Sequence, residues 1–197
     1  MINPVSKFIS PEEYLALEER AEFRNEYYGG EIFAMSGGSI NHNQITLNLA
    51  TNLTQQFRHK PCRVFSSDVR LHIPKSGLYT YPDVMIICGK LEFLPKRDDT
   101  VLNPSVLVEV WSDSTQAYDR GKKFALYRQI PTLQEYVMID QTRAYVEHFR
   151  RDGHFWVLET LEQMDTTLAL PALECQIPLA ALYEKVEWQN PPSESEK

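Results

Sequence analysis

A glutamate inside an apolar run is the first feature of this sequence that points to chemistry. Glu109 lies within residues 106–111, Val-Leu-Val-Glu-Val-Trp, a pattern typical of a strand covered on both faces of a sheet. An ionised carboxylate is costly there unless a metal ion or a basic side chain neutralises it, or its pKa rises until it is protonated. The ordinary alternatives are a buried salt bridge and an outward-facing glutamate on an edge strand.

A second carboxylate opens another apolar stretch. Asp83 follows Pro82 and precedes Val-Met-Ile-Ile-Cys at residues 84–88. Taken alone, a Pro-Asp pair is common by chance and is an ordinary start for a strand. If the two strands are neighbours, however, Asp83 and Glu109 converge at one end of a sheet. A hard divalent cation, Mg²⁺ or Mn²⁺, would then relieve their repulsion, bind a phosphate oxygen and activate water.

Hydrolysis of a phosphodiester also needs a cation that stabilises the charge developing around phosphorus or orients the attacking water. Lys122 and Lys123 lie on a helix predicted at about residues 115–129, directly after the strand that carries Glu109. Asp119 and Lys123 are four residues apart, so an ion pair on the helix surface is the alternative interpretation.

The order and spacing of these residues resemble the PD-(D/E)XK nuclease superfamily, which has the fold of restriction endonucleases. In that motif a lysine stands two residues after the second acid, where this sequence has Trp111. The wider pattern resembles the Uma-two type of restriction endonuclease, from about residue 10 to residue 182. The matching segments are Gly30-Glu31-Ile32, His42, Pro82-Asp83, Glu109-Val110-Trp111-Ser112, Asp119-Arg120-Gly121-Lys122-Lys123, Tyr127 and Glu135-Tyr136-Val137.

The resemblance implies a metal site. Asp83 and Glu109 would be its ligands, and the main-chain carbonyl of Val110 would add one oxygen. Lys123 would take the place of the motif lysine, and the cofactor would be Mg²⁺ or Mn²⁺.

The resemblance also implies roles for residues outside this pair of acids. Glu31 would complete the metal shell, although an exposed hairpin glutamate is an equally good interpretation. His42 would contact phosphate or assist a proton transfer; the more ordinary interpretation is a helix-start side chain with local hydrogen bonds. Asp119 would orient Lys123, whereas Tyr127 and Tyr136 are expected in the core.

Hydrophobic periodicity predicts the elements that must position these residues. A helix over about residues 10–20 begins with a capping box and a proline, a hairpin follows at 26–35, and a second helix carries apolar residues at 45, 49, 53 and 57. Strands are expected at 64–73, 83–88, 106–111, 135–139, 144–149 and 155–161, with a loop over most of 89–104, and a short strand near 168 and a helix near 179–185 follow. This pattern predicts an α/β (or α+β) fold, a restriction endonuclease-like mixed sheet flanked by helices. We expect one domain over residues 1–188 and a disordered tail at 189–197.

Composition limits the classes of protein that fit. The chain has 197 residues, of which 43% are hydrophobic, and no apolar run approaches the ~18 residues of a membrane span. Without a signal pattern at the start, it is expected in the cytoplasm with no membrane partner. Cys62, Cys88 and Cys175 are scattered, so we expect neither a disulfide framework nor a CxxC metal site. The net charge of −7 argues against a broadly basic surface, but residues 54–75 and 119–128 are locally basic.

These features favour a metal-dependent endonuclease that hydrolyses phosphodiester bonds in DNA, acting as a homodimer by analogy with other nucleases of the fold. The alternative is a catalytically weak or inactive nucleic-acid-binding or regulatory protein on the same fold, which Trp111 and the negative charge favour. A third reading is a structural or oligomer-forming protein with an accidental acidic pair. Full activity in both Asp83→Ala and Glu109→Ala would contradict the first reading, and binding that does not depend on salt would count against any DNA partner.

Overall fold

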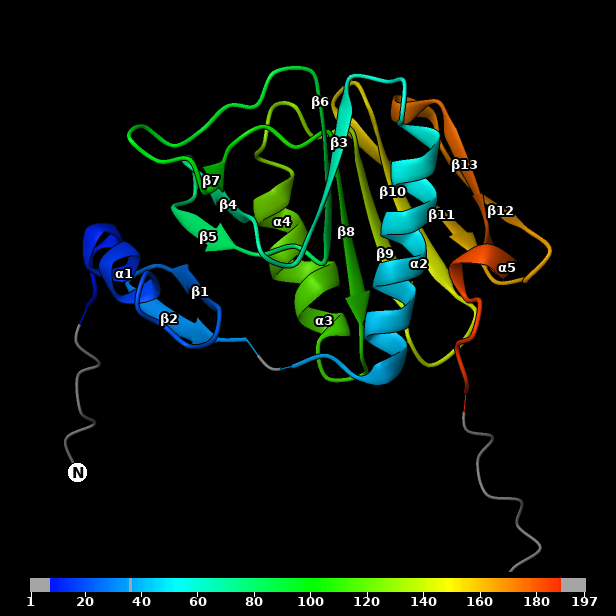
Figure 1. The fold of residues 1–197 in the computed structure, drawn as a ribbon, viewed down its shortest axis with the longest axis horizontal. Coiled ribbons are helices and arrows are strands. Elements are labelled where there is room, and N and C mark those ends of the chain that lie inside the picture. Colours follow the sequence, from blue (N-terminus) through cyan, green and yellow to red (C-terminus); the bar gives the residue numbers. More distant parts are fainter. Residues whose placement is uncertain (1–7, 36, 189–197) are drawn as a thin grey trace, which may run out of the picture.

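Two mixed sheets and a long helix organise the described part of the chain, which in this computed structural model comprises residues 8–35 and 37–188 (Figure 1). The first half contains α1 (Pro11–Glu18), β1 (Asn25–Tyr28), β2 (Glu31–Ala34), α2 (Ile40–Gln56), β3 (Cys62–Ser66), β4 (Arg70–Ile73), β5 (Leu78–Thr80), β6 (Val84–Cys88) and β7 (Thr100–Val101). The second half contains β8 (Val106–Trp111), α3 (Gln116–Tyr118), the π-helical turn η1 (Asp119–Lys123), α4 (Phe124–Tyr127), β9 (Glu135–Asp140), β10 (Val146–Asp152), β11 (Phe155–Leu161), β12 (Thr167–Leu170), the 3₁₀ turn η2 (Pro171–Leu173), β13 (Cys175–Pro178) and α5 (Leu179–Leu182). The fold class is therefore α+β, with mixed sheets flanked by helices, as the sequence predicts.

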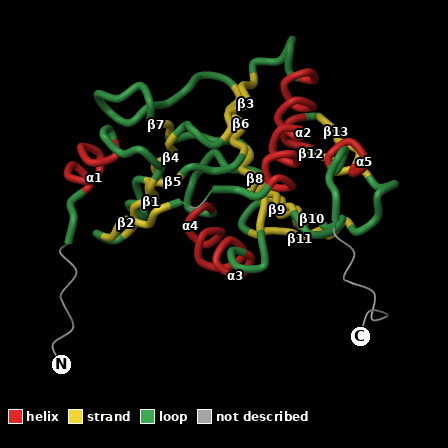
Figure 2. The backbone as a smooth tube through the Cα atoms, turned by 60° about the horizontal axis from the view of Figure 1, so that its bottom comes forward, coloured by secondary structure: helices red, strands yellow, loops and turns green. Residues whose placement is uncertain are grey.

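The larger sheet has the order β11-β10-β9-β8-β6-β3 and provides the floor on which the acids stand. Its strands are antiparallel except for β8 and β9, which pair in parallel. Helix α2 lies over one face and the α3–α4 segment over the other (Figure 2). Because side chains alternate along a strand, even-numbered residues of β8 pack towards α2 and odd-numbered residues towards α4.

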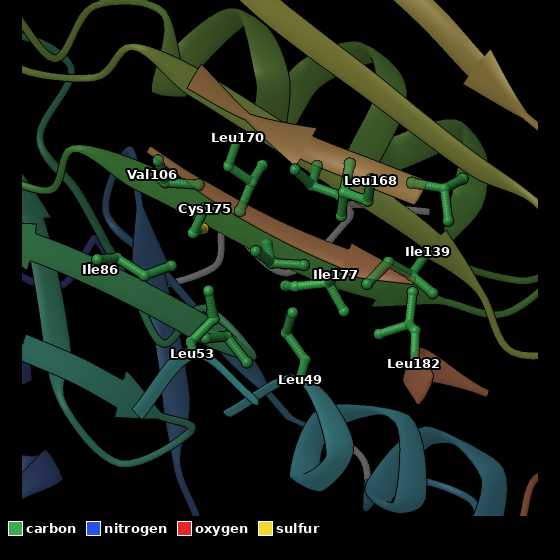
Figure 3. Close-up of a cluster of buried hydrophobic side chains, with 14 of the residues drawn as sticks. Leu49, Leu53, Ile86, Val106, Ile139, Leu168, Leu170, Cys175, Ile177 and Leu182 are labelled. Atoms are coloured by element: carbon green, nitrogen blue, oxygen red, sulfur yellow. The ribbon is translucent and has the colours of Figure 1, made fainter. Parts of the chain in front are cut away.

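The core on the α2 face explains why that helix forms where it does. Ile45, Leu49 and Leu53 recur at four-residue spacing and are fully buried. They pack against the even-numbered residues of β6 and β8, against Val137 and Ile139 of β9, and against β12, β13 and α5. Figure 3 shows part of this cluster, including Leu49, Leu53 and Ile139. Ser39 caps the helix by accepting a hydrogen bond from the N–H of His42. The apolar stripe and the cap together place the first turn of α2 at one end of the sheet.

The smaller sheet, ordered β2-β1-β5-β4-β7, carries the N-terminal hairpin. Gly29 and Gly30 make its turn with positive φ angles of 60° and 89°. Helix α1 packs on this sheet through a cluster of tyrosines, Tyr14, Tyr27 and Tyr79. The predicted capping box is present, with Ser10 and Glu13 exchanging hydrogen bonds of 3.1 Å and 2.9 Å. These contacts hold α1 and the hairpin to β5 of the smaller sheet.

Local geometry differs from the sequence prediction in the middle of the chain. The single strand predicted at 64–73 is two strands, because the chain leaves the larger sheet at Ser66 and enters the smaller one at Arg70. Ser67, with a φ of 52°, makes the bend between them. The strands β5, β7 and β13 are three additional short strands. Each is only two to four residues long, too short to give a periodic signal.

The expectation of no disulfide is wrong. Cys62 on β3 and Cys88 on β6 are directly opposite each other in the antiparallel register, and a disulfide joins them. The sequence separation of 26 residues gives no hint of this pairing, because strand register alone brings the two sulfurs together. Cys175 is free and buried.

Among the described residues, no helix combines the length and the apolar character needed to cross a membrane. The tail predicted at 189–197 lies outside the described residues, and the single domain over 1–188 stays a prediction.

Candidate active site

A cavity of about 470 Å³ opens where the end of β8, the start of β6 and the first turn of α2 meet the hairpin and α3. Its lining contains four carboxylates, one lysine and one histidine: Glu26, Asp83, Glu109, Asp119, Lys123 and His42. The rest of the lining comes from the end of β2 and the chain that leads to α2, from Val110 and the segment after β8, and from Tyr118 and Gln141. Two of the acids are those that the apolar strand patterns single out.

Glu109 is the floor of this cavity. Its odd position on β8 turns the carboxylate away from α2 and towards α4, and only 4% of the residue is exposed. The hydroxyl of Tyr127 donates a hydrogen bond of 2.6 Å to Glu109 Oε1, and the ammonium of Lys123 lies 2.9 Å from the same oxygen. The buried salt bridge considered for this glutamate is therefore present, and it lies inside the cavity.

Lys123 comes from the π-helical turn η1, which interrupts the helix predicted at 115–129. Its Nζ lies 3.2 Å from Glu26 Oε1 and 3.7 Å from Asp119 Oδ1, besides its contact with Glu109. The side chain is 7% exposed, so the surface ion pair considered for Asp119 and Lys123 does not describe this residue. A π turn widens the helix by one residue and is often found at functional sites.

Trp111 stands on the same face of β8 as Glu109, where the motif lysine would be. It is buried and meets Tyr145 edge to face, with ring centroids 5.9 Å apart. The ammonium of Lys123 reaches Glu109 from the neighbouring helix instead. The tertiary structure thus brings a lysine to the acid although the motif position holds a tryptophan.

Asp83 stands beside Glu109 because β6 and β8 are antiparallel neighbours. Val84 pairs with Val108, so the next position outward on each strand is one of the two acids. Asp83 Oδ2 accepts a hydrogen bond of 2.8 Å from the N–H of Val110. In an extended strand the N–H and C=O of one residue point to the same side, so the Val110 carbonyl also lies on the edge that faces Asp83.

His42 approaches Asp83 from the first turn of α2. Its Nε2 lies 3.1 Å from Asp83 Oδ2, so the ring contacts an acid far away in sequence and not only its own helix start. The approach requires a glycine at position 38, because a Cβ there would lie 2.5 Å from His42 Nδ1. That Nδ1 is buried, with no hydrogen-bond partner in the described part of the chain.

Burial and crowding of carboxylates shift the titration of this cluster. Desolvation, followed by the charges of Asp83 and Asp119, raises the pKa of Glu109 to about 8 even though Lys123 opposes the shift. Desolvation also raises the pKa of Asp119. For His42, burial lowers the pKa, but the hydrogen bond and charge of Asp83 outweigh it and the net direction is upward. The four carboxylates of the lining therefore outnumber its two basic side chains, Lys123 and His42.

The structure places most of the sequence-predicted residues around this cavity. Asp83, Glu109, Val110, Lys123 and His42 all line it, and Asp119 joins them. Tyr127 and Tyr136 are buried core residues as expected, and Tyr127 also binds Glu109.

Glu31 is the exception. It is exposed at the turn end of β2 and is not part of the lining. The hairpin acid that faces the cavity is Glu26, which pairs across the hairpin with Phe33 and contacts Lys123. Both glutamates are on the same face of the hairpin, but Glu26 lies two positions nearer the larger sheet. Alternation along β1 could have suggested Glu26, whereas the distance to β8 could not be read from sequence.

The locally basic segment at 54–75 does not extend the site. Arg58 and Lys60 follow the C-terminal end of α2, whose 17 residues span about 25 Å from the turn that carries His42. Arg70 is buried and donates to Tyr81 Oη at 2.8 Å. Of the other basic segment, Lys123 reaches the cavity, while Lys122 lies over the ring of Tyr28. The two locally basic segments of the sequence therefore lie in different parts of the structure, and Lys123 is their one basic residue in the cavity lining.

The donor set fits a hard divalent cation with an incomplete protein shell. No three His, Cys, Asp or Glu side chains within residues 8–35 and 37–188 form a ready-made metal cage. Mg²⁺ is usually held by one or two carboxylates and keeps several waters or phosphate oxygens. Asp83 and Glu109, with the Val110 carbonyl on the strand edge that faces Asp83, match that requirement, and the excess negative charge favours a cation.

Comparisons with known proteins agree with this architecture. The profile of the Uma2 family, described as "Putative restriction endonuclease", matches residues 11–181. Two uncharacterized proteins of Synechocystis sp. (strain ATCC 27184 / PCC 6803 / Kazusa) are similar to this chain. One, sll1609, is 40% identical over 82% of this chain and 92% of its own length. The other, slr1290, is 39% identical over 76% of this chain and 79% of its own length.

A solved structure shares the fold. It is the crystal structure of "a putative nuclease belonging to DUF820" from Anabaena variabilis ATCC 29413, with a TM-score of 0.69 and 17% sequence identity. The similarity covers 87% of this chain and 96% of that one.

Proposed function

The chain belongs to the Uma2 family, and from that membership and the geometry of the cavity we propose that it is a metal-dependent endonuclease that hydrolyses phosphodiester bonds in DNA. The observation that carries the proposal is the pair of neighbouring carboxylates, Asp83 and Glu109, at the end of two antiparallel strands with the ammonium of Lys123 at 2.9 Å. Mg²⁺ or Mn²⁺ would be held by these two carboxylates and the Val110 carbonyl. When bound, the ion would act as a Lewis acid on the phosphoryl group and make water acidic enough to attack near neutral pH.

Lys123 supplies the positive charge that the chain itself contributes. During hydrolysis the oxygen of water forms a bond to phosphorus, and the bond from phosphorus to one ester oxygen breaks. The proton that water loses ends on the leaving oxygen, so the products are a phosphate monoester end and a hydroxyl end. Negative charge builds on the phosphoryl oxygens in between, and a fixed, nearly buried ammonium stabilises it strongly.

Other side chains hold this group in place. Tyr127 fixes one oxygen of Glu109, and Glu26 and Asp119 hold Lys123 against the cavity floor. His42 orients Asp83 through its contact at 3.1 Å. These are positioning roles, because each residue acts through a group that would touch the metal or the phosphate.

Calorimetric titration with Mn²⁺, followed by a cleavage assay on labelled DNA with Mg²⁺, tests the proposal. The wild type should bind Mn²⁺ saturably, and both Asp83→Asn and Glu109→Gln should lose binding and cleavage while keeping the native circular dichroism spectrum. Glu31→Gln is the matched control, because it removes a carboxylate of the same family motif that lies outside the cavity. Full cleavage by Asp83→Asn or Glu109→Gln would refute the assignment of the site. Metal-independent binding of nucleic acid without cleavage would favour the inactive binding protein instead.

A further inference from the structure

Two exposed aromatic rings stand at the mouth of the cavity. Phe33 on β2 is 44% exposed and Tyr118 on α3 is 38% exposed, and both belong to the lining. Phe33 pairs with Glu26 across the hairpin, which puts its ring on the same face as that carboxylate. Tyr118, on α3, lines the same cavity as Glu26. The two rings therefore line the same cavity from two separate elements.

The remainder of the lining suits hydrogen bonding more than charge neutralisation. It presents hydroxyls and one amide, from Ser39, Ser112, Ser114, Thr115 and Gln141. Among the described residues that line the cavity, Lys123 is the one lysine or arginine, and three carboxylates surround its ammonium. Duplex DNA is gripped mainly through many lysine and arginine contacts to phosphates. This lining offers few such contacts, whereas aromatic rings stack on any unpaired base.

The depth of Glu109 and Lys123 in the cavity also favours a flexible single strand over a duplex. Glu109 and Lys123 lie at the floor and are almost inaccessible from bulk solvent. The cavity volume of about 470 Å³ is in the range of sites that enclose one small ligand. A nucleotide of a flexible single strand can enter such a space and bring its phosphate to the floor. A stacked and paired duplex would first have to release a nucleotide from its helix.

We propose that the cavity binds an unpaired nucleotide of single-stranded DNA, with its base stacked on Phe33 and Tyr118 and its phosphate directed towards Glu109 and Lys123. The cleavage of such a strand rests on the function proposed above, whereas its binding does not. Phe33 and Tyr118 would thus select unpaired DNA over duplex, a specificity that the acidic pair by itself cannot provide.

Fluorescence anisotropy tests the binding without cleavage. A labelled single strand of mixed sequence, its blunt duplex and the RNA strand of the same sequence are titrated with protein in Ca²⁺. The wild type should bind the DNA strand more tightly than either competitor. Phe33→Ala and Tyr118→Ala should each weaken binding of the strand by about five- to 150-fold, the range for loss of one base–aromatic stack. Tyr118→Phe should keep it, because the ring remains.

Phe155→Ala is the matched control, because Phe155 is an exposed phenylalanine (76%) on β11 and lies outside the cavity lining. Equal or tighter binding of duplex or RNA, or wild-type affinity in both alanine variants, would overturn the inference. DNA cleavage by a protein whose alanine variants bind normally would leave the nuclease proposal standing and remove this one. Ring-dependent binding of the strand with no cleavage under Mg²⁺ would do the reverse.

Discussion

Removal of the Lys123 ammonium is the perturbation that most directly probes the buried cluster. Lys123→Met keeps the length and apolar stem of the side chain but leaves Glu109 and Glu26 without their cation at 2.9 Å and 3.2 Å. The side chains of Lys123 and Glu109 are 7% and 5% exposed, so water cannot replace the lost contact. Breaking a buried ion pair on one side typically costs about 3–5 kcal/mol. At a pH above the pKa of about 8 of Glu109, where this carboxyl is ionised, we expect a loss of that size in the free energy of unfolding.

The double variant Lys123→Met/Glu109→Gln separates an ion pair from two independent effects. Glu109→Gln alone keeps an oxygen for the Tyr127 hydroxyl and leaves Lys123 beside Glu26 and Asp119, so we expect a smaller loss of about 1–3 kcal/mol. In the double variant no ionised carboxylate is stranded at position 109, and its loss should be clearly smaller than the sum of the two single losses.

Urea denaturation of the four proteins measures the coupling. The loss caused by Lys123→Met should also shrink at a pH well below the pKa of about 8 of Glu109, because a protonated carboxyl needs no cation. If the two single losses add to within about 0.5 kcal/mol and the loss does not change with pH, the buried pair is not an energetic unit and the reasoning fails.

Three further predictions concern metal, backbone and covalent structure. Glu109 holds a proton below its pKa of about 8, and a bound metal must displace that proton. The affinity for Mn²⁺, measured by calorimetry, should therefore rise by up to about tenfold per pH unit and level off above this pKa. An affinity that does not change with pH would contradict either the pKa of Glu109 or its role as a ligand. Gly38→Ala should displace the ring of His42 and reduce cleavage, because the new Cβ would lie 2.5 Å from His42 Nδ1. Gly37→Ala should leave cleavage unchanged, because its Cβ would meet nothing within 4 Å. Equal cleavage by the two variants would contradict a positioning role for His42. The disulfide that joins β3 to β6 links two cysteines 26 residues apart in the sequence. Its reduction should lower the free energy of unfolding, measured by urea denaturation, by about 3–4 kcal/mol. Unchanged stability in dithiothreitol would show that the bond is absent or does not stabilise the fold.

Elements with a strong local sequence pattern could be predicted, whereas elements that depend on tertiary contacts could not. The helix at α2 and the buried strands β6 and β8 could be read from the sequence, because an apolar stripe or run of that length favours one secondary structure. The split between β3 and β4 and the π turn η1 could not, because the first depends on which sheet each half joins and the second on packing around Lys123.

The same division holds for the site. Glu109 could be singled out because an acid in a buried strand is costly and calls for an explanation. The choice between Glu26 and Glu31 required the placement of the hairpin against the larger sheet, a contact between segments far apart in the chain.

The sequence alone therefore specifies the available chemistry: two acids on apolar strands, a lysine on the following helix and the order of segments that marks the Uma2 family. Which of these groups meet depends on the tertiary structure. It set the antiparallel register that puts Asp83 next to Glu109 and the disulfide pairing, and it brought Lys123 to the place that Trp111 leaves without a cation. The physical reason is that charge and hydrogen-bond energies act over a few ångströms, and distances of that size between remote residues are set by packing and not by local propensity.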